Sequence, residues 1–266
     1  MSVLVAIPAR YASSRYPGKP LVPLTGATGA TKSLIRRSWE AAMQVSGVDR
    51  VVVATDDDRI RAEAEGFGAE VVMTSSDCRN GTERCAEVSR ALGDGHDIVV
   101  NLQGDAPLTP PWFVEALVAG LAADPDAEVA TPVLRCDGAA LNGFLADRRA
   151  GRVGGTTAVF GAGGRALYFS KEVIPYTGRG YAEADETPVF HHVGVYAYRP
   201  AALAAYTGWP PGPLETLEGL EQLRFLEHGR AVLCVEVEAR GRDFWELNNP
   251  EDVARIEAMM ARMGIE

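Results

Sequence analysis

Short runs of apolar residues recur in the first half of the chain and predict strands. The three runs are Val3–Ile7, Val51–Thr55 and Ile98–Leu102. Unbroken apolar runs of this length are typical of strands that are buried on both faces of a sheet. Three helices and one further short strand are predicted between and after these runs, at Ser33–Ser46, Asp57–Phe67, Thr82–Leu92 and Glu70–Met73. This alternation predicts an α/β fold with a mostly parallel sheet that is flanked by helices.

The second half of the chain changes character and predicts a smaller β region. The runs Thr157–Phe160 and Ala166–Ser170 are separated by four small residues and predict a hairpin. The stretch from Cys136 to Gly155 is rich in Gly, Ala and Arg, which is typical of a mobile surface loop. The remaining strands are predicted at Glu128–Val133, Val189–Tyr198 and Val232–Val237. The remaining helices are predicted at Trp112–Ala123, Pro213–His228 and Asn249–Met263, the last with Asn249 as its cap.

Composition narrows the class of protein. A chain of 266 residues, 47% of them hydrophobic and 23% charged, has the ordinary mixture of a globular protein of one domain. Its formal net charge of -10 argues against nucleic-acid binding, which requires neutralisation of phosphates by Lys and Arg. No stretch reaches the roughly 18 apolar residues that a membrane span needs, and no secretory signal precedes the first strand. The four cysteines lack the spacing of a metal site or disulfide framework, so the cytoplasm is the expected compartment.

The stretch from Ile7 to Leu21 concentrates positive charge directly after the first strand. Arg10, Arg15 and Lys19 lie there among small residues, prolines and a glycine. Loops at the carboxyl ends of strands in α/β sheets bind ligands, and cations with backbone N–H groups suit a polyphosphate. A solvated basic loop is the alternative. The position after the strand favours a nucleotide triphosphate site.

Asp105 follows the third predicted strand in the same way, after a glycine. A carboxylate at the end of a strand suits Mg²⁺ that bridges phosphate oxygens, although a lone Asp is also a common turn former. The segment Asn80–Arg84 is predicted to begin a helix and to cap it, and it can also contact a nucleotide. The spacing in the helix predicted at Pro213–His228 places several acidic side chains on one polar face, which is either a solvated surface or a second binding surface. His191 and His192 lack the pattern of a metal site.

Taken together, these motifs resemble those of the 3-deoxy-manno-octulosonate (Kdo) cytidylyltransferases, also called CMP-Kdo synthetases. The similarity runs from Val3 to about Val253. The segments that carry it are IPARYASSRYPGKPL (Ile7–Leu21), VVATD (Val52–Asp56), NGTER (Asn80–Arg84), NLQGDAPL (Asn101–Leu108), ALYFSKEVIPY (Ala166–Tyr176), HHVGVYAYR (His191–Arg199), PLETLEGLEQLRFLEHG (Pro213–Gly229) and NPEDV (Asn249–Val253).

The resemblance implies a Rossmann-like nucleotidyltransferase fold with one domain over residues 1–266. Residues of about 134–212 would form a sugar-binding and dimerisation subregion, and the enzyme would be a cytoplasmic homodimer of lipopolysaccharide biosynthesis. It would join CTP to Kdo, an acidic sugar, with Mg²⁺, releasing CMP-Kdo and pyrophosphate. The 2-hydroxyl group of the sugar would attack the α-phosphorus in line.

The resemblance also implies roles for individual residues. Catalysis would rest on Arg10, Arg15, Lys19 and Asp105, with Lys19 having the largest effect on the chemical step. The nucleotide would contact Ala9, Arg10, Ser13, Ser14, Lys19, Thr82, Arg84 and Gln103. The sugar would contact Gln103, His192, Tyr196, Glu218, Glu221 and Gln222. The metal ligands would be Asp105 and Asn248.

Departures from the family pattern leave alternatives open. Asn248 stands where the family usually has Asp, and Asp243 and Glu246 are additional carboxylates nearby. The lysine that normally precedes the ALYFS segment is missing near Gly154–Thr157, where Arg148, Arg149 or Arg152 could supply the charge. The alternatives are a cytidylyltransferase for 8-amino-Kdo or a nonulosonic acid, a sugar-1-phosphate nucleotidyltransferase, a glycosyltransferase or a nucleotide-binding protein without activity.

Overall fold

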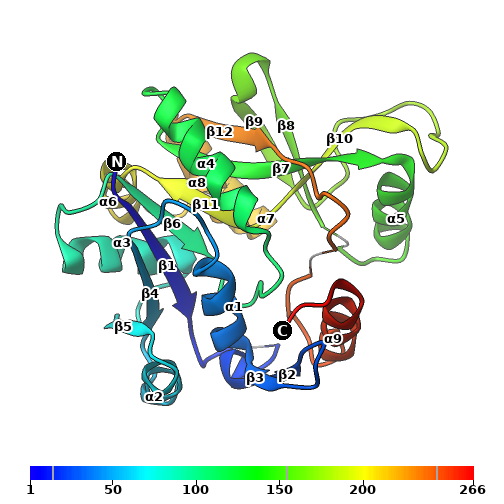
Figure 1. The fold of residues 1–266 in the computed structure, drawn as a ribbon. Helices are drawn as coiled ribbons and strands as arrows, with labels where there is room; N and C mark the ends of the chain where they lie inside the picture. Colours follow the sequence, from blue (N-terminus) through cyan, green and yellow to red (C-terminus); the bar gives the residue numbers. More distant parts are fainter. Residues whose placement is uncertain (14, 154, 244) are drawn as a thin grey trace. The chain divides into compact units, whose positions relative to one another are not determined.

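A computed structural model describes residues 1–13, 15–153, 155–243 and 245–266 (Figure 1). The chain divides into two compact units. The first unit consists of Met1–Glu115, Tyr198–Ala204 and Ala239–Glu266, and the second of Ala116–Ala197 and Ala205–Glu238. Most of the predicted subregion 134–212 belongs to the second unit, and its role in sugar binding and dimerisation stays a prediction. No helix in the described part of the chain is long and apolar enough to cross a membrane.

A four-stranded parallel sheet in the order β5-β4-β1-β6 forms the centre of the first unit. The strands are β1 (Val3–Ala9), β4 (Arg50–Thr55), β5 (Glu70–Met73) and β6 (Ile98–Leu102). The helices that pack on them are α1 (Leu34–Ala42), α2 (Asp58–Gly66) and α3 (Gly81–Leu92). Because helices cover this sheet, its central strands are mostly apolar, and every residue of β6 is buried.

Each of these three helices begins directly after a polar residue that caps it. The side chains of Ser33 and Asp57 accept hydrogen bonds from backbone N–H groups of the first turns of α1 and α2. The Asn80 Oδ1 atom accepts one from the Glu83 N–H group at 2.9 Å. The capping role predicted for the Asn80 segment is therefore confirmed.

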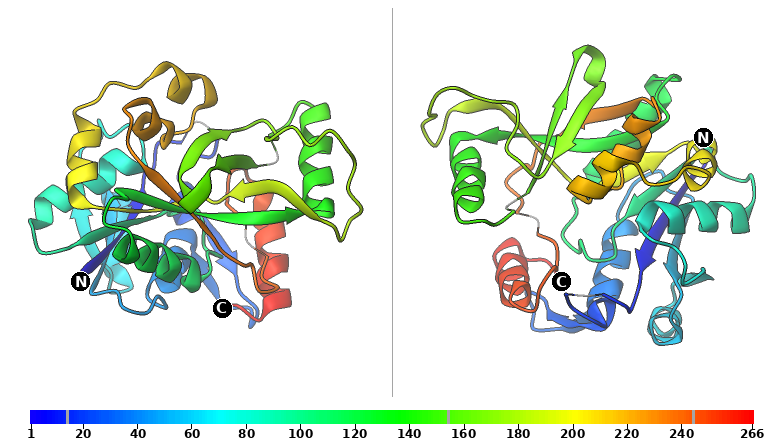
Figure 2. Two further views of the ribbon diagram at one scale, coloured as in Figure 1. Left: turned by 90° about the horizontal axis from the view of Figure 1, so that it is seen from above. Right: turned by 180° about the vertical axis from the view of Figure 1, so that it is seen from behind.

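A second apolar cluster in the first unit joins a small hairpin to the last helix. The hairpin strands are β2 (Pro23–Thr25) and β3 (Thr31–Ser33), preceded by a single 3-10 turn, Lys19–Leu21, and the last helix is α9 (Asp252–Met263). Leu24, Leu247 and Ile256 are fully buried in this cluster. Figure 2 shows α9 in red beside the blue hairpin. Strands of three residues leave no periodic signal, and the sequence pattern did not predict them.

The last helix begins three residues later than predicted. Residues 249–251 form a turn, and Asn249 does not cap the helix. Instead, the carboxylate of Asp252 accepts hydrogen bonds from the backbone N–H groups of Asn248 at 2.9 Å and Asn249 at 2.7 Å. Asp252 thereby ties the segment before the helix to the helix itself.

The second unit contains a mixed sheet that is mostly antiparallel. β10 pairs antiparallel with β7 and β8, β8 pairs antiparallel with β9, and β12 pairs parallel with β7. The strands are β7 (Val129–Asp137), β8 (Thr156–Phe160), β9 (Ala166–Ser170), β10 (Glu186–His192) and β12 (Val232–Glu236). The helices α4 (Pro111–Ala123) and α6 (Pro200–Thr207) have residues in both units. The predicted hairpin, smaller β region and α/β class are confirmed.

The predicted loop between Cys136 and Gly155 is wrong, because most of it is a helix, α5 (Gly138–Arg149) (Figure 1). Asp137 caps this helix by accepting a hydrogen bond from the Ala140 N–H group at 2.8 Å. Leu141 is buried, and Phe144 and Leu145 pack beside it. These three apolar residues have helical spacing, which the surrounding Gly, Ala and Arg residues obscured.

Two further elements are interrupted where the pattern predicted continuity. The strand predicted at Val189–Tyr198 is two strands, β10 and β11 (Val195–Tyr198), with a break at residues 193–194. The helix predicted at Pro213–His228 is α7 (Pro213–Glu218) and α8 (Leu223–Glu227). Gly219 ends α7 in the left-handed conformation, with φ of 62°. The acidic side chains therefore do not share one continuous helix face.

Candidate active site

The loop after β1 folds back on itself. The Gly18 N–H group donates a hydrogen bond to the Tyr11 carbonyl oxygen at 2.9 Å, and the Ser13 hydroxyl accepts one from the Tyr16 N–H group at 3.4 Å. Arg10 and Arg15 are both exposed. Ala9 is the buried last residue of β1, whereas Ser14 lies outside the described residues. The loop presents two cations from a compact backbone, as an anion site requires.

The end of this loop meets two segments that lie far away in the sequence. Lys19 Nζ forms an ion pair with the Asp105 carboxylate, and Arg15 Nη2 donates to Asn248 Oδ1 at 2.9 Å. The Leu247 N–H group donates to the Asp105 carbonyl oxygen at 2.9 Å. Gly104 lets the segment after β6 pass close to β1, since a Cβ atom there would lie 2.7 Å from the Pro8 carbonyl oxygen. Four residues predicted for phosphate and metal binding are therefore neighbours.

Glu246 joins the same cluster, a position that sequence reasoning identified only as an additional carboxylate. Burial first and the nearby Asp105 second raise the pKa of its carboxyl group to about 7, against the opposing effects of the Asn248 amide, Lys19 and Arg15. Among the described residues, no basic side chain forms an ion pair with Glu246. The cluster therefore contains a second carboxyl group without a cation of its own.

The start of α3 is held by internal contacts. The Thr82 hydroxyl lies 2.8 Å from the Tyr198 hydroxyl, and Arg84 contacts the Thr74 hydroxyl and Asp56, whose Oδ1 atom lies 3.2 Å from Arg84 Nη2. Both Thr82 and Arg84 are buried. Their side chains are thus engaged within the first unit, and a contact with a nucleotide stays a prediction.

Gln103 lies beside the first turn of α3. Asn101, which sequence reasoning missed, lies there as well. A Cβ atom on Gly81 would lie 3.2 Å from Gln103 Nε2 and 2.9 Å from Asn101 Nδ2. Asn101 is fully buried, and both polar atoms of its amide lack a hydrogen-bond partner in the described part of the chain. A polar residue in the otherwise apolar β6 was the available signal.

The second unit brings three of the predicted sugar-binding residues together. His192 Nε2 lies 3.0 Å from the Thr131 hydroxyl, and the rings of His192 and Tyr196 are 5.6 Å apart. The Tyr196 hydroxyl donates to Gln222 Oε1 at 3.1 Å. Burial, and to a smaller extent the neighbouring His191, lowers the pKa of His192 to about 3. His192 is therefore neutral at physiological pH, and the three residues form an uncharged polar cluster.

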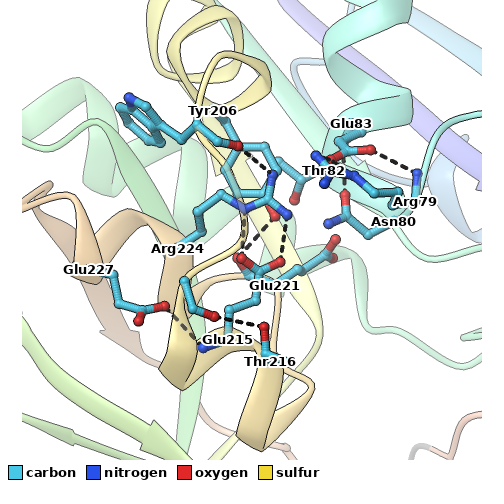
Figure 3. A network of polar contacts seen from close by, with 12 residues as sticks. Arg79, Asn80, Thr82, Glu83, Tyr206, Glu215, Thr216, Glu221, Arg224 and Glu227 are labelled. Carbon is cyan, nitrogen blue, oxygen red and sulfur yellow. Dashed lines mark hydrogen bonds and ion pairs between the residues drawn. The ribbon is translucent and has the colours of Figure 1, made fainter.

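The acidic residues of α7 and the following turn have separate partners. The Glu218 carboxylate accepts hydrogen bonds from the Ser170 hydroxyl at 2.6 Å and the Lys171 N–H group at 2.9 Å. Glu215 and the buried Arg224 form a bidentate pair with two distances of 2.6 Å (Figure 3). Glu221 is partly buried, and its carbonyl oxygen accepts from the Tyr206 hydroxyl at 3.2 Å. Glu215 thus has a structural role that the spacing did not predict.

The potential metal ligands beside the loop that follows β1, here called the phosphate loop, are mostly oxygen atoms. No group of three His, Cys, Asp or Glu side chains is placed to hold a metal in the described ranges. Asp105 and Glu246 nevertheless offer carboxyl groups, and Asn248 offers an amide oxygen that accepts from Arg15. This chemistry fits Mg²⁺, which prefers a few carboxylates and keeps other positions for water and phosphate.

Comparison with known proteins decides the family. The sequence pattern of the family described as "Cytidylyltransferase" matches residues 4–233. A 3-deoxy-manno-octulosonate cytidylyltransferase from Maricaulis maris is 44% identical over 265 residues, which cover 99% of each chain. The chain belongs to the 3-deoxy-manno-octulosonate cytidylyltransferase family. It is therefore a nucleotidyltransferase enzyme.

Other members of the family and a solved structure agree. The Zea mays cytidylyltransferase is 40% identical, with 98% of this chain and 81% of that protein covered. A structure of CMP:2-keto-3-deoxy-manno-octonic acid synthetase complexed with CTP has a TM-score of 0.83 and 35% identity over 99% of this chain and 100% of that one. The Rossmann-like nucleotidyltransferase fold predicted from the motifs is thus confirmed. The roles of individual residues stay predictions.

Proposed function

We propose that this cytidylyltransferase joins CTP and Kdo to give CMP-Kdo and pyrophosphate with Mg²⁺. The observation that supports this most is the convergence of Arg15, Lys19, Asp105 and Asn248 in a family whose relatives carry that activity in their names. The first unit would bind CTP, and the second unit would bind the acceptor sugar.

The phosphate loop would bind the triphosphate of CTP and hold it in position for the reaction. Arg10 and Arg15 are exposed and would hold the triphosphate, while Ala9, Ser13, Ser14, Thr82, Arg84 and Gln103 would shape the nucleotide site. Lys19 would leave Asp105 for the α-phosphate, where charge develops in the transition state. The oxygen of the sugar hydroxyl bonds to the α-phosphorus as the bond to pyrophosphate breaks, and the hydroxyl proton is released.

Mg²⁺ would be held by Asp105 and Asn248, and it would neutralise negative charge on the phosphoryl oxygens. The Asp105 backbone is tied to Leu247, which keeps the two ligand segments together before any metal binds. This pre-organisation lowers the entropic cost of forming the site.

The sugar site would use uncharged groups for orientation. His192, Tyr196 and Gln222 are buried and bonded in a fixed arrangement. Glu218 is the last residue of α7, and Glu221 lies in the turn that follows. The Nε2 atom of Gln222 is buried without a partner among the described residues, so it is free to donate to an acceptor oxygen. Gln103 in the first unit would contact the base or the sugar.

A coupled pyrophosphate assay tests the proposal. CTP and UTP are offered with Kdo, 8-amino-Kdo, nonulosonic acids and sugar 1-phosphates, with Mg²⁺ and with excess chelator. We expect pyrophosphate only with CTP, Kdo and Mg²⁺. Turnover of CTP with a sugar phosphate, and none with any free ulosonic acid, would contradict the proposal. CTP binding in calorimetry without release of pyrophosphate from any acceptor would indicate a binding protein.

A further inference from the structure

The backbone of Tyr11 closes the phosphate loop. Its carbonyl oxygen accepts a hydrogen bond from the Gly18 N–H group at 2.9 Å, so positions 11 and 18 are neighbours. The Gly18 carbonyl oxygen accepts from the Leu21 N–H group at 2.9 Å and thereby starts the short turn that follows. Arg10 directly precedes Tyr11, and Lys19 directly follows Gly18. This closure therefore fixes the backbone beside two of the cations predicted to bind phosphate.

The side chain of Tyr11 packs on the same glycine. A Cβ atom on Gly18 would lie 3.1 Å from the Cε2, Cζ and Oη atoms of Tyr11. Gly18 is buried, and its φ of 72° lies in the left-handed region that glycine adopts without strain. The ring and the backbone hydrogen bond of Tyr11 therefore hold Gly18 in the same place.

Arg59 covers the Tyr11 ring from the first turn of α2. The carbon at the centre of its guanidinium group lies 3.3 Å from the centroid of the ring, where a cation is attracted by the face of the aromatic system. The guanidinium group also donates to the Asp57 carboxylate, from Nε at 3.0 Å and from Nη2 at 2.6 Å. These two planar hydrogen bonds fix the orientation of Arg59 over the ring.

The helix α2 provides a rigid anchor for this contact. The same Asp57 carboxylate caps the helix by accepting from the backbone N–H groups of Arg59 at 2.9 Å and Ile60 at 3.4 Å. Ile60 and Ala64 are fully buried, and α2 packs against β4, β5 and the turn that begins with Lys19. The phosphate loop is therefore fastened, through Tyr11, to a helix whose position the sheet determines.

Arg59 differs from the cations of the loop in the partner that it has. Arg59 pairs with a carboxylate, which balances its charge, whereas Arg15 donates to the uncharged amide of Asn248. A guanidinium group in a bidentate pair with a carboxylate has little charge left to attract phosphate. Arg59 is thus suited to act on a bound anion through Tyr11 and not by direct contact.

We propose that Tyr11 and Arg59 are a pair of positioning residues that hold the phosphate loop in the shape that binds the triphosphate of CTP. Tyr11 acts through Gly18 and the adjoining Arg10 and Lys19, and Arg59 acts through Tyr11. This inference rests on the proposed function, since it takes the loop as the triphosphate site. A loop that is already ordered loses less entropy on binding, so loss of the pair weakens the binding of the triphosphate.

The test compares the binding of two nucleotides in calorimetry, with Mg²⁺ and without any sugar. CMP has the same nucleoside as CTP but lacks the two outer phosphates, so it measures the rest of the nucleotide site. Tyr11→Ala should weaken CTP binding about tenfold and leave CMP binding within about twofold. Tyr11→Phe keeps the ring and should bind CTP like the parent. Arg61→Ala removes an exposed arginine of the same helix, paired with Glu65 at 3.2 Å, and serves as the control.

A double variant tests whether the two residues act as one device. Arg59→Ala should weaken CTP binding about threefold, in the range expected for a cation over an aromatic ring at the surface. Tyr11→Ala combined with Arg59→Ala should be no weaker than Tyr11→Ala alone, because the arginine acts through the ring. Losses that multiply in the double variant would show that Arg59 contacts the nucleotide independently and would overturn the pairing.

The remaining outcomes separate this inference from the proposed function. Unchanged CTP binding in Tyr11→Ala would overturn the inference. Equal weakening of CTP and CMP would show general damage to the nucleotide site and would overturn it as well, as would a parent that binds CTP no more tightly than CMP. Failure of the proposed function has a different signature, because the parent would then bind CTP more tightly than CMP and yet release no pyrophosphate with Kdo.

Discussion

The polar groups of the two candidate sites have different surroundings in the two units. In the first unit, Lys19 pairs with Asp105 and Arg15 pairs with Asn248, and these side chains are partly exposed to solvent. In the second unit, His192 and Gln222 are buried, and the histidine is kept neutral by the loss of its hydration. Exposed charges can exchange partners at low cost, whereas a buried neutral cluster has one arrangement.

This difference matches the chemistry of the two proposed substrates. A triphosphate needs cations that can leave their resting partners and follow developing charge. A sugar is distinguished by the positions of its hydroxyl groups. A sugar with a misplaced hydroxyl group binds poorly, because it leaves buried polar groups of the protein without a hydrogen-bond partner. The comparison predicts that variants in the first unit change the rate, and that variants in the second change the affinity for the acceptor or the response to pH.

The largest expected effect belongs to Lys19. Lys19→Ala removes the cation proposed for the α-phosphate and should lower kcat by roughly 10²–10³-fold, the usual range for a lost oxyanion donor. Steady-state release of pyrophosphate measures it. Lys32→Ala, which removes a lysine paired with Glu40 at 2.8 Å, serves as the matched control and should stay within twofold. A kcat for Lys19→Ala within about threefold of the parent would refute the assignment.

An intermediate effect is expected on the stability of the protein at acidic pH, through the buried histidines of the second unit. Burial lowers the pKa of His191 to about 4 and of His192 to about 3, so the unfolded chain binds protons near pH 6.5 that the folded chain does not. Stability is therefore full above pH 6.5 and declines as pH falls towards those values. The free energy of unfolding should therefore decline less in His192→Gln than in the parent between pH 7.5 and 5, by roughly 2 kcal/mol.

Urea unfolding at the two pH values measures this difference. His228→Gln changes an exposed histidine and should leave the decline as it is. Equal declines in the parent and in His192→Gln would show that this histidine is not held neutral by burial.

The smallest expected effect tests the acceptor site. Gln222→Met keeps the length of the side chain and removes the buried Nε2 donor, which should raise KM for the acceptor about tenfold, the cost of one hydrogen bond. KM for CTP should stay the same. Gln44→Met, at an exposed position, is the control. A rise in KM for CTP instead would place Gln222 at the nucleotide and break the comparison.

Much of the fold could be predicted where local signals agree. The apolar runs of β1, β4 and β6 and the capping segment at Asn80 were sufficient, because burial on both faces and capping are properties of neighbouring residues. The helix α5 was missed, although Asp137 and the spacing of Leu141, Phe144 and Leu145 were present. Its small residues weakened the local pattern, and packing against Cys136 and Val189 decided the helix.

The sequence by itself determined the family, the parallel sheet and the chemical types at the phosphate loop, since motifs and periodicity are local. Only the tertiary structure decided which charges meet. Gly219 ends α7, so Glu215 pairs with Arg224 while Glu218 bonds Ser170. The hydrogen bond from Leu247 to Asp105 brings Glu246 to the cluster. Electrostatic interactions depend on distance in space, and no spacing along the chain specifies that distance.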